Sequence, residues 1–447
     1  MRKQSRRILV GLVIILFLCG VLYAIAVGRA TAHLRGAYAT LRHNGRPMQP
    51  EDVIPPEIAE TQDAVPRYQE TVSPLKEQYI EGDNLLEYLG SLSAKFHDEP
   101  VSVDRSEIEE LLRRDVVAQV LSSLECEASF PICRVDRDYL PNDLKTRFLI
   151  LEDLRSIAYI LGAEARMESE GENPGSAWNA ILTGFRLADA LIPYPGCEGQ
   201  WQRLMIASYL CEVIQQICEE VQPSPRDYKV VEGALRRHAD VAVLVRALDA
   251  QRLLIGERLF RMPADTLYEA LNKTADSTNG IPLYFRRATF KPTFIADHAS
   301  YLQLMSKCVE FLQQPYSPRK GKLYTEIVSL AKSGLLSKVL APPIAATKTC
   351  YCREATLMQV TRAGLALLEY QERHKRFPET LGDLNLEGLT DPFTLKPLHY
   401  RTDGEGYSVY SVGEDLNDNA GLPRQPGQRR DYDLVWRWPG HNNEESP

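Results

Sequence analysis

This 447-residue chain has few long apolar runs. One lies near the N-terminus, and no further run of membrane length follows it. This excludes a multi-pass membrane protein. The single run, residues 8–28, carries no charged side chain. As a helix it rises about 31 Å at ~1.5 Å per residue, enough to cross a bilayer core. We expect a single-pass transmembrane helix that contacts lipid through residues 8–28.

A cleaved signal peptide is the alternative for this segment, with Ala24-Ile25-Ala26 as its cleavage site. The apolar run is longer than the core of a typical signal peptide, which favours an uncleaved anchor. Acidic residues are absent from the first flank, which carries the cations Arg2, Lys3, Arg6 and Arg7. The second flank carries the more widely spaced Arg29, Arg35, Arg42 and Arg46. The positive-inside rule therefore favours a cytoplasmic N-terminus.

Catalytic signatures are also missing. The sequence contains no H-E-x-x-H, no Walker phosphate loop, no G-x-G-x-x-G and no G-x-S-x-G. Its eight histidines are scattered. Adjacent acids such as Glu109-Glu110 fall on predicted helices, where neighbouring residues do not face each other. We therefore expect no enzymatic activity, no catalytic residue and no organic cofactor.

The charge beyond the N-terminal flank is acidic. Without its first four cations the chain has 48 basic and 60 acidic residues, a formal charge of −12. Such a domain as a whole is poorly suited to binding nucleic acid or anionic lipid surfaces, so no nucleic-acid partner is expected. Of nine cysteines, Cys19 lies in the apolar run and eight follow it. Cys126 and Cys133 are the best disulfide candidates in an exported domain, and small buried hydrophobic residues are the equal alternative.

Helical periodicity dominates residues 71–345. Ser106-x-x-Glu109 predicts a capping box, and Ile108, Leu112 and Val116 recur every four residues behind it. A helical hairpin follows, with arms from residue 144 and near residue 178 joined by the turn 171–175. It resembles a tetratricopeptide unit, but no 34-residue period repeats three times. Further helices are expected over 198–220, 225–260 and 297–314, a loop over 270–296 and a hinge over 341–352.

The last hundred residues change pattern. A helix is expected over 353–376, ended by Pro378. Alternating residues then predict strands around 398–402, 407–412 and 434–438, and the glycines of 403–406 suit a tight turn. One helix against a three-stranded antiparallel sheet is large enough to be stable. The expected fold class is mainly α, with a transmembrane helix, an α-helical ectodomain and this small α+β module.

Several motifs of this module are shared with one family. The run EYQERHKRFPETLGDL is followed by DPFTLKPLHY, GYSVYSVGED and DYDLVW. Residues 353–439 thereby resemble the C-terminal globular domain of type II secretion system major pseudopilins. The prepilin leader of that family is absent, so a filament subunit is not expected. The arrangement of anchor, helical body and module also resembles envelope proteins of planctomycete-type bacteria.

The resemblance implies a metal site, because the loop of that family often binds calcium. The matching carboxylates are Asp415, Asp431 and Asp433. Three carboxylates, backbone carbonyls and water would meet the six to eight oxygens that calcium takes. The alternative is a solvated acidic loop neutralised by Arg424, Arg429 and Arg430.

Four segments are therefore predicted: an anchor with its basic flank (1–28), a partly extended juxtamembrane stalk (29–70), a helical ectodomain (71–345) and a pseudopilin-like module (346–447). We expect a bacterial cytoplasmic-membrane protein with its bulk on the periplasmic side. Its expected role is contact with other envelope proteins, linked to type II secretion or pilus-like machinery. The alternative is an enzyme or substrate-binding module within 71–345 without a recognisable motif. Sequence does not fix its oligomeric state.

Overall fold

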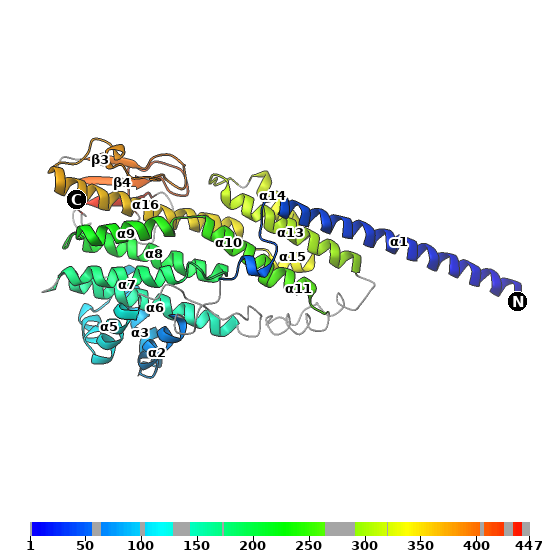
Figure 1. The fold of residues 1–447 in the computed structure, drawn as a ribbon, viewed down its shortest axis with the longest axis horizontal. Coiled ribbons are helices and arrows are strands. Elements are labelled where there is room, and N and C mark those ends of the chain that lie inside the picture. The colour runs from blue at the N-terminus through cyan, green and yellow to red at the C-terminus, as the bar shows by residue number, and fades with distance from the viewer. Residues whose placement is uncertain are drawn as a thin grey trace.

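The fold is mainly helical, with a long N-terminal helix leaving a body of packed helices and a small sheet at the far end of that body (Figure 1). This is a computed structural model of the whole chain. It describes residues 2–55, 64–98, 103–127, 144–171, 174–263, 291–319, 321–402, 406–423 and 432–439. The predicted fold class is confirmed in these residues.

Helix α1 (Arg2–His43) is continuous through the apolar run and beyond it. Among the described residues it is the one helix long and apolar enough to cross a membrane, and none of its apolar window is buried in the protein. The prediction of partly extended chain from residue 29 is wrong as far as His43. The reason is an apolar stripe, Ala30, Ala37 and Leu41, which is buried where α1 packs on α13 and so favours continued helix.

After a single 3-10 turn, η1 (Pro50–Asp52), the first layer of the body contains α2 (Ala64–Lys76), a short hairpin of β1 (Tyr79–Ile80) and β2 (Asp83–Asn84), α3 (Leu85–Asp98), α4 (Arg105–Leu112) and α5 (Asp115–Glu127). The predicted capping box is wrong by two residues. Asp104 is the N-cap of α4, and its carboxylate accepts the backbone N–H of Ser106 at 2.9 Å. An ionised carboxylate at the N-cap is a strong hydrogen-bond acceptor, and its negative charge interacts favourably with the positive end of the helix dipole.

The predicted helical hairpin is confirmed as α6 (Leu144–Ser169) and α7 (Ala177–Ala190), joined through η5 (Pro174–Ser176), and α8 (Cys197–Ile217) packs on both. Gly162 allows the close approach of α6 and α8. A Cβ there would lie 2.2 Å from the Tyr209 hydroxyl, which donates to the Tyr159 carbonyl at 3.1 Å. These three helices form the centre of the main hydrophobic core.

The helix predicted over 225–260 is divided. Helix α9 (Pro225–His238) is followed by α10 (Ala242–Ala250), the π-helical turn η6 (Gln251–Gly256) and α11 (Glu257–Arg261). The break has a local cause, because the Asp240 carboxylate accepts the N–H of Ala242 at 2.8 Å and starts a new helix.

Helix α13 (Lys291–Gln313) begins six residues before its predicted start, and α14 (Lys322–Lys332) and α15 (Leu335–Leu340) follow. The rest of the predicted loop, 270–290, lies outside the described residues. So do Cys133 and the side chain of Cys126, the predicted disulfide pair. The seven cysteines whose side chains are described are free, and four of them are buried.

The hinge predicted over 341–352 is wrong, because helix α16 (Ile344–His374) already includes most of it. Pro343 occupies its N-cap position, where the missing N–H costs nothing. Ile344 is buried in the main core, whereas Cys352 is buried with Phe393 and Leu434 of the C-terminal module, so this first part of α16 contacts both parts of the protein. The predicted boundary at residues 345/346 thus falls inside one helix, which packs on α8 and α9 as well as on the sheet.

The predicted C-terminal sheet is confirmed. A 3-10 turn, η8 (Leu381–Leu384), leads to β3 (His399–Thr402), β4 (Tyr407–Ser411) and β5 (Leu434–Trp438). The strands are antiparallel in the order β3-β4-β5, with Val409 opposite both Tyr400 and Trp436. The sheet lies on α16 (Figure 1).

Candidate functional site

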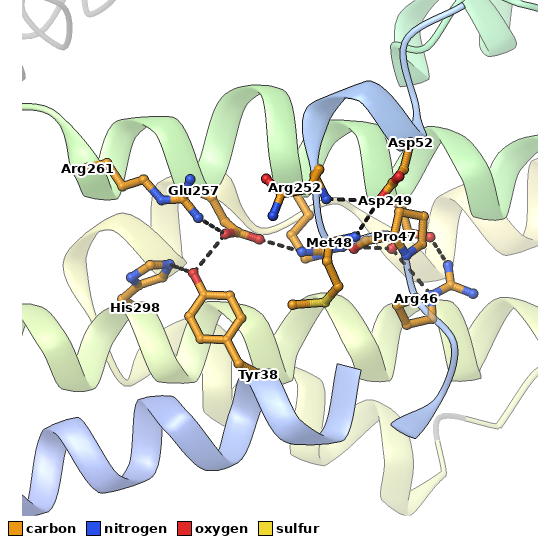
Figure 2. Close-up of polar contacts among 11 residues, drawn as sticks. Tyr38, Arg46, Pro47, Met48, Asp52, Asp249, Arg252, Glu257, Arg261 and His298 are labelled. Atoms are coloured by element: carbon orange, nitrogen blue, oxygen red, sulfur yellow. Dashed lines mark hydrogen bonds and ion pairs between the residues drawn. The ribbon is translucent and has the colours of Figure 1, made fainter. Parts of the chain in front are cut away.

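The first candidate site is the anchor junction, where the end of α1 meets α10, η6, α11 and α13 (Figure 2). We use this name for Tyr38, Arg46, Asp249, Arg252, Glu257 and His298. Glu257 and Arg252 are each about 1% exposed and Asp249 is 4% exposed, so these charges are inside the protein. Buried charges persist only where they are paired and hydrogen-bonded.

Each buried charge of the junction has such a partner. The Glu257 carboxylate accepts hydrogen bonds from Arg252, from the Tyr38 hydroxyl at 2.7 Å and from Arg261 at 2.8 Å. Arg252 also donates to the Pro47 carbonyl, just beyond α1. Two buried carboxylates and their arginines therefore connect the chain that follows the apolar helix to the body.

The π-helical turn explains why two of these residues meet. Arg252 and Glu257 are five residues apart, a spacing that points side chains in different directions on an α-helix. A π-helix forms i→i+5 backbone bonds and brings such residues onto one face. Here Arg252 and Glu257 form a direct ion pair.

At the other end of the junction, Arg46 closes the connection through an ion pair with Asp249, whose Oδ1 accepts Arg46 Nε at 3.3 Å. Gly45, with φ +64°, turns the chain after α1 so that Arg46 can reach this carboxylate. The turn continues to Asp52, whose carboxylate accepts the N–H groups of Met48 and Gln49 at 2.9 Å each.

Burial sets the protonation of the uncharged members. Burial raises the pKa of Tyr38, so its hydroxyl stays protonated and donates to Glu257. Burial, with the nearby Arg261 cation as the smaller cause, lowers the pKa of His298 to about 4. The His298 ring stacks on Phe260 at 4.5 Å between centroids. A neutral His298 is compatible with the neighbouring Arg261 cation.

Sequence reasoning missed this junction, since we expected extended chain there. Two signals were present: the first 50 residues contain no acid, and Arg46 is followed by the acids Glu51 and Asp52. Their partners on residues 249–257 lie about 200 positions away, and nothing in the sequence pairs them.

The second candidate site is a groove on the surface where the end of α13, the start of α16 and the C-terminal module meet. It consists of two adjoining pockets of about 680 Å³ and about 610 Å³. Both are lined by Tyr316, Pro318, Ala345 and Thr349. Each volume is within the range of small-molecule sites.

Tyr316 fixes the middle of the groove. Its ring packs edge-on against Phe393 at 4.8 Å between centroids, and its hydroxyl donates to the Glu414 carbonyl at 3.2 Å. Beneath it, the buried Lys348 ammonium donates to the Leu312 carbonyl at 2.6 Å and so satisfies the C-terminal end of α13. These contacts hold the residues at the base of the groove in place.

Opposite charges line the larger pocket. Arg353 and Asp415 both line it. Among the described residues, Arg353 forms an ion pair with Glu354 at 3.8 Å. Asp415 Oδ1 accepts the N–H of Asn417 at 3.0 Å, whereas its Oδ2 is covered and has no partner among the described residues. The half-buried thiol of Cys350 lies in the same wall, and burial raises its pKa.

The three predicted metal ligands have different environments. Asp415 lines the groove, Asp433 is 1% exposed beneath the acidic loop, and Asp431 lies outside the described residues. The Asp433 carboxylate accepts the N–H of Gly421 at 2.6 Å and of Asn419 at 3.3 Å, which holds the loop. Burial raises the pKa of Asp433, and those two hydrogen bonds oppose the shift. Across the described ranges, no three His, Cys, Asp or Glu residues form a group suited to a metal ion.

An aromatic floor with both signs of charge suits an amphipathic ligand or an extended polypeptide segment. The chain was compared with protein-family models, curated proteins and solved structures, and none of them matches.

Proposed function

We propose that this chain is a single-pass membrane protein of a bacterial envelope that acts by protein–protein contact, with the groove as its binding surface. The observation that carries the proposal is the continuity of the two pockets across Tyr316 and Pro318. A surface that long, aromatic at its centre and charged at its rim, has the composition of a protein-recognition site.

The anchor junction supports the same role. It fixes the body to a helix suited to crossing the membrane, through charges that would be costly to separate. The groove is thereby held at a constant orientation to the lipid surface, which suits capture of a partner in the same membrane. We place the N-terminus in the cytoplasm and the body in the periplasm, on the distribution of basic residues.

A link to type II secretion or pilus-like machinery is part of the proposal and rests on the pseudopilin-like sequence of residues 353–439. Within that sequence, Asp415 is the proposed calcium ligand that lines the groove.

The second candidate function is binding or conversion of a small molecule, and the larger pocket favours it. Arg353 and Asp415 converge on about 680 Å³, enough for a zwitterionic ligand. The two candidates differ in the size of the occupant, which an experiment can resolve.

The test places a photoreactive amino acid at Ser317, which lines the groove, and at Val230 on α9 as a matched exposed control. In intact cells, we expect one defined polypeptide to cross-link to position 317. The same polypeptide should not cross-link to position 230. Arg353→Glu should remove the adduct, whereas Arg226→Glu on α9 should not.

An absence of groove-specific polypeptide adducts would contradict the protein-contact proposal. Alkylation of Cys350 then decides the alternative. Protection of this thiol by a cell fraction containing only small molecules, lost in Arg353→Glu, would support small-molecule binding.

A further inference from the structure

The end of the body that faces the anchor is cationic. Three segments meet there: α1 after residue 28, α11 and the first two turns of α13. Their exposed charges are Arg29, Arg35, Arg42, Arg258, Arg261 and Lys291. Within these segments, the carboxylates are Glu257 and Asp297, and both are buried.

Neither of these carboxylates is available at the surface. Glu257 belongs to the anchor junction. Asp297 accepts the backbone N–H groups of Leu336 and Ser337 at 2.9 and 3.2 Å and so caps α15. Arg261 pairs with Glu257, and the other exposed cations of this end have no ion pair with an acid of their own segments among the described residues.

The junction fixes the height of α11 above the membrane. Tyr38 contacts Glu257 and Arg46 contacts Asp249, so the α10–α11 segment runs antiparallel to α1. Tyr38 lies ten residues beyond Gly28, about 15 Å along the helix, and Glu257 lies at the level of Tyr38. Arg261 is four residues further along α11, about 6 Å nearer to the apolar span than Glu257. Arg261 thus lies roughly 9 Å from the apolar span, at the depth of lipid headgroups. Figure 2 shows Arg261 and Arg46 at opposite ends of the junction.

The start of α13 lies at the same level. The Phe294 ring is 5.4 Å from the Phe260 ring, next to Arg261 in sequence. Lys291 is the first residue of α13, one helical turn before Phe294, and it is exposed. Arg261 itself is 61% exposed at its side chain, although it donates to Glu257.

We propose that Arg35, Arg258, Arg261 and Lys291 form a cationic collar that binds the phosphate groups of anionic phospholipids around the base of α1. The anchor holds the collar within a Debye length of the headgroups, where each cation attracts an anionic surface. Guanidinium groups also match phosphate oxygens in two-point hydrogen bonds. The collar does not depend on the groove. It rests on the proposed membrane anchoring by α1, and it requires that the leaflet facing the body contains anionic lipid.

The test uses the full chain in nanodiscs of zwitterionic phosphatidylcholine or of phosphatidylcholine with about one third phosphatidylglycerol. Hydrogen exchange of the backbone amides of 257–262 and 293–297 should be at least ~5-fold slower in the anionic discs at about 0.05 M salt. The difference should largely disappear at about 0.5 M salt. Free glycerol phosphate added to zwitterionic discs should not reproduce it.

The variant Arg35→Gln/Arg258→Gln/Lys291→Gln removes three cations with no ion pair among the described residues, and we expect it to lose the difference. The control Arg226→Gln/Lys229→Gln/Arg236→Gln makes the same charge change on α9, far from the exit of α1, and should keep it. Equal exchange in both disc types at low salt would overturn the collar. So would a difference that survives in the first variant, or one that the control variant loses equally.

Discussion

Trp436 of β5 lies directly on the backbone of Gly364 in α16, so closely that a Cβ on Gly364 would be 2.4 Å from the indole ring. The same glycine carbonyl accepts the Tyr407 hydroxyl at 2.7 Å, and that hydroxyl accepts the Trp436 indole N–H at 3.0 Å. A buried chain of two hydrogen bonds thus fixes the sheet to the helix, and it requires glycine at position 364.

Gly364→Ala should therefore destabilise the protein, by about 1–3 kcal/mol, because the added methyl group must displace a buried indole. The measurement is the midpoint of chemical denaturation followed by tryptophan fluorescence. Gly233→Ala is the control, since the nearest atom to its Cβ is the flexible Arg237 guanidinium at 3.5 Å. This control should be neutral or stabilising by up to about 1 kcal/mol. Equal effects of the two substitutions would contradict the tight contact.

The C-terminal module was predictable because its signals are local. Alternation in 398–402 and 407–412 and the turn between them specify a hairpin, and Pro378 marks a helix end. The hinge prediction failed for a non-local reason. Two prolines and small residues in 341–352 indicate a break, but burial of Ile344 in the main core and of Cys352 against Phe393 favours helix.

The candidate sites were predictable only in part. Asp415 was selected from sequence and does line the groove, yet its neighbours Tyr316 and Arg353 come from other elements. The anchor junction depends on pairs such as Tyr38 with Glu257, 219 residues apart. The spacing of residues along the sequence does not predict such long-range contacts.

Glu257→Gln should weaken the anchor junction severely. It removes the closer of the two anionic partners of the buried Arg252 guanidinium and leaves Asp249 at 3.5 Å, and breaking a buried ion pair typically costs about 3–5 kcal/mol. Glu326→Gln is the matched control, because its ion pair with Lys307 at 2.7 Å is partly exposed and contributes about 1 kcal/mol or less. Thermal melting in detergent measures both. A similar, small loss for the two variants would show that the junction does not hold the anchor.

Acid should destabilise the fold through two histidines. Burial lowers the pKa of His238 to about 4, and of His298 likewise to about 4, from 6.5. His238 faces the Arg203 guanidinium at 2.8 Å and the Asp189 carboxylate at 3.1 Å, and His298 faces Tyr38 and Arg261. Between pH 6.5 and 4 the unfolded chain binds more protons, so stability is complete above 6.5 and falls as pH falls through this window.

The loss at each histidine approaches about 3 kcal/mol near pH 4. We expect the melting temperature to fall steadily from pH 6.5 to 4.5, and His238→Gln to show a shallower fall. A Gln side chain can both accept from Arg203 and donate to Asp189, so the variant tests titration with the contacts preserved. An identical pH profile for variant and parent protein would exclude His238 as a cause.

Calcium binding at the acidic loop should appear as a higher melting temperature in millimolar calcium than in chelator, because a ligand of the folded state stabilises it. The full chain is required, since α16 is buried against α8 and α9 as well as against the sheet. Asp415→Asn should abolish the shift, and the exposed Glu220→Gln should leave it unchanged. No shift in the parent protein at millimolar calcium would remove the site.

The orientation of the anchor can be tested with a membrane-impermeant maleimide. Four cations crowd residues 2–7, whereas the second flank spreads its four over residues 29–46, and this asymmetry predicts a cytoplasmic N-terminus. A thiol introduced by Val230→Cys, at a 44% exposed position of α9, should then react from outside spheroplasts. One introduced by Gln4→Cys should react only after lysis. The reverse pattern would place the body in the cytoplasm, and with it the groove and its partner, since one continuous helix fixes the two ends of α1 on opposite sides of the bilayer.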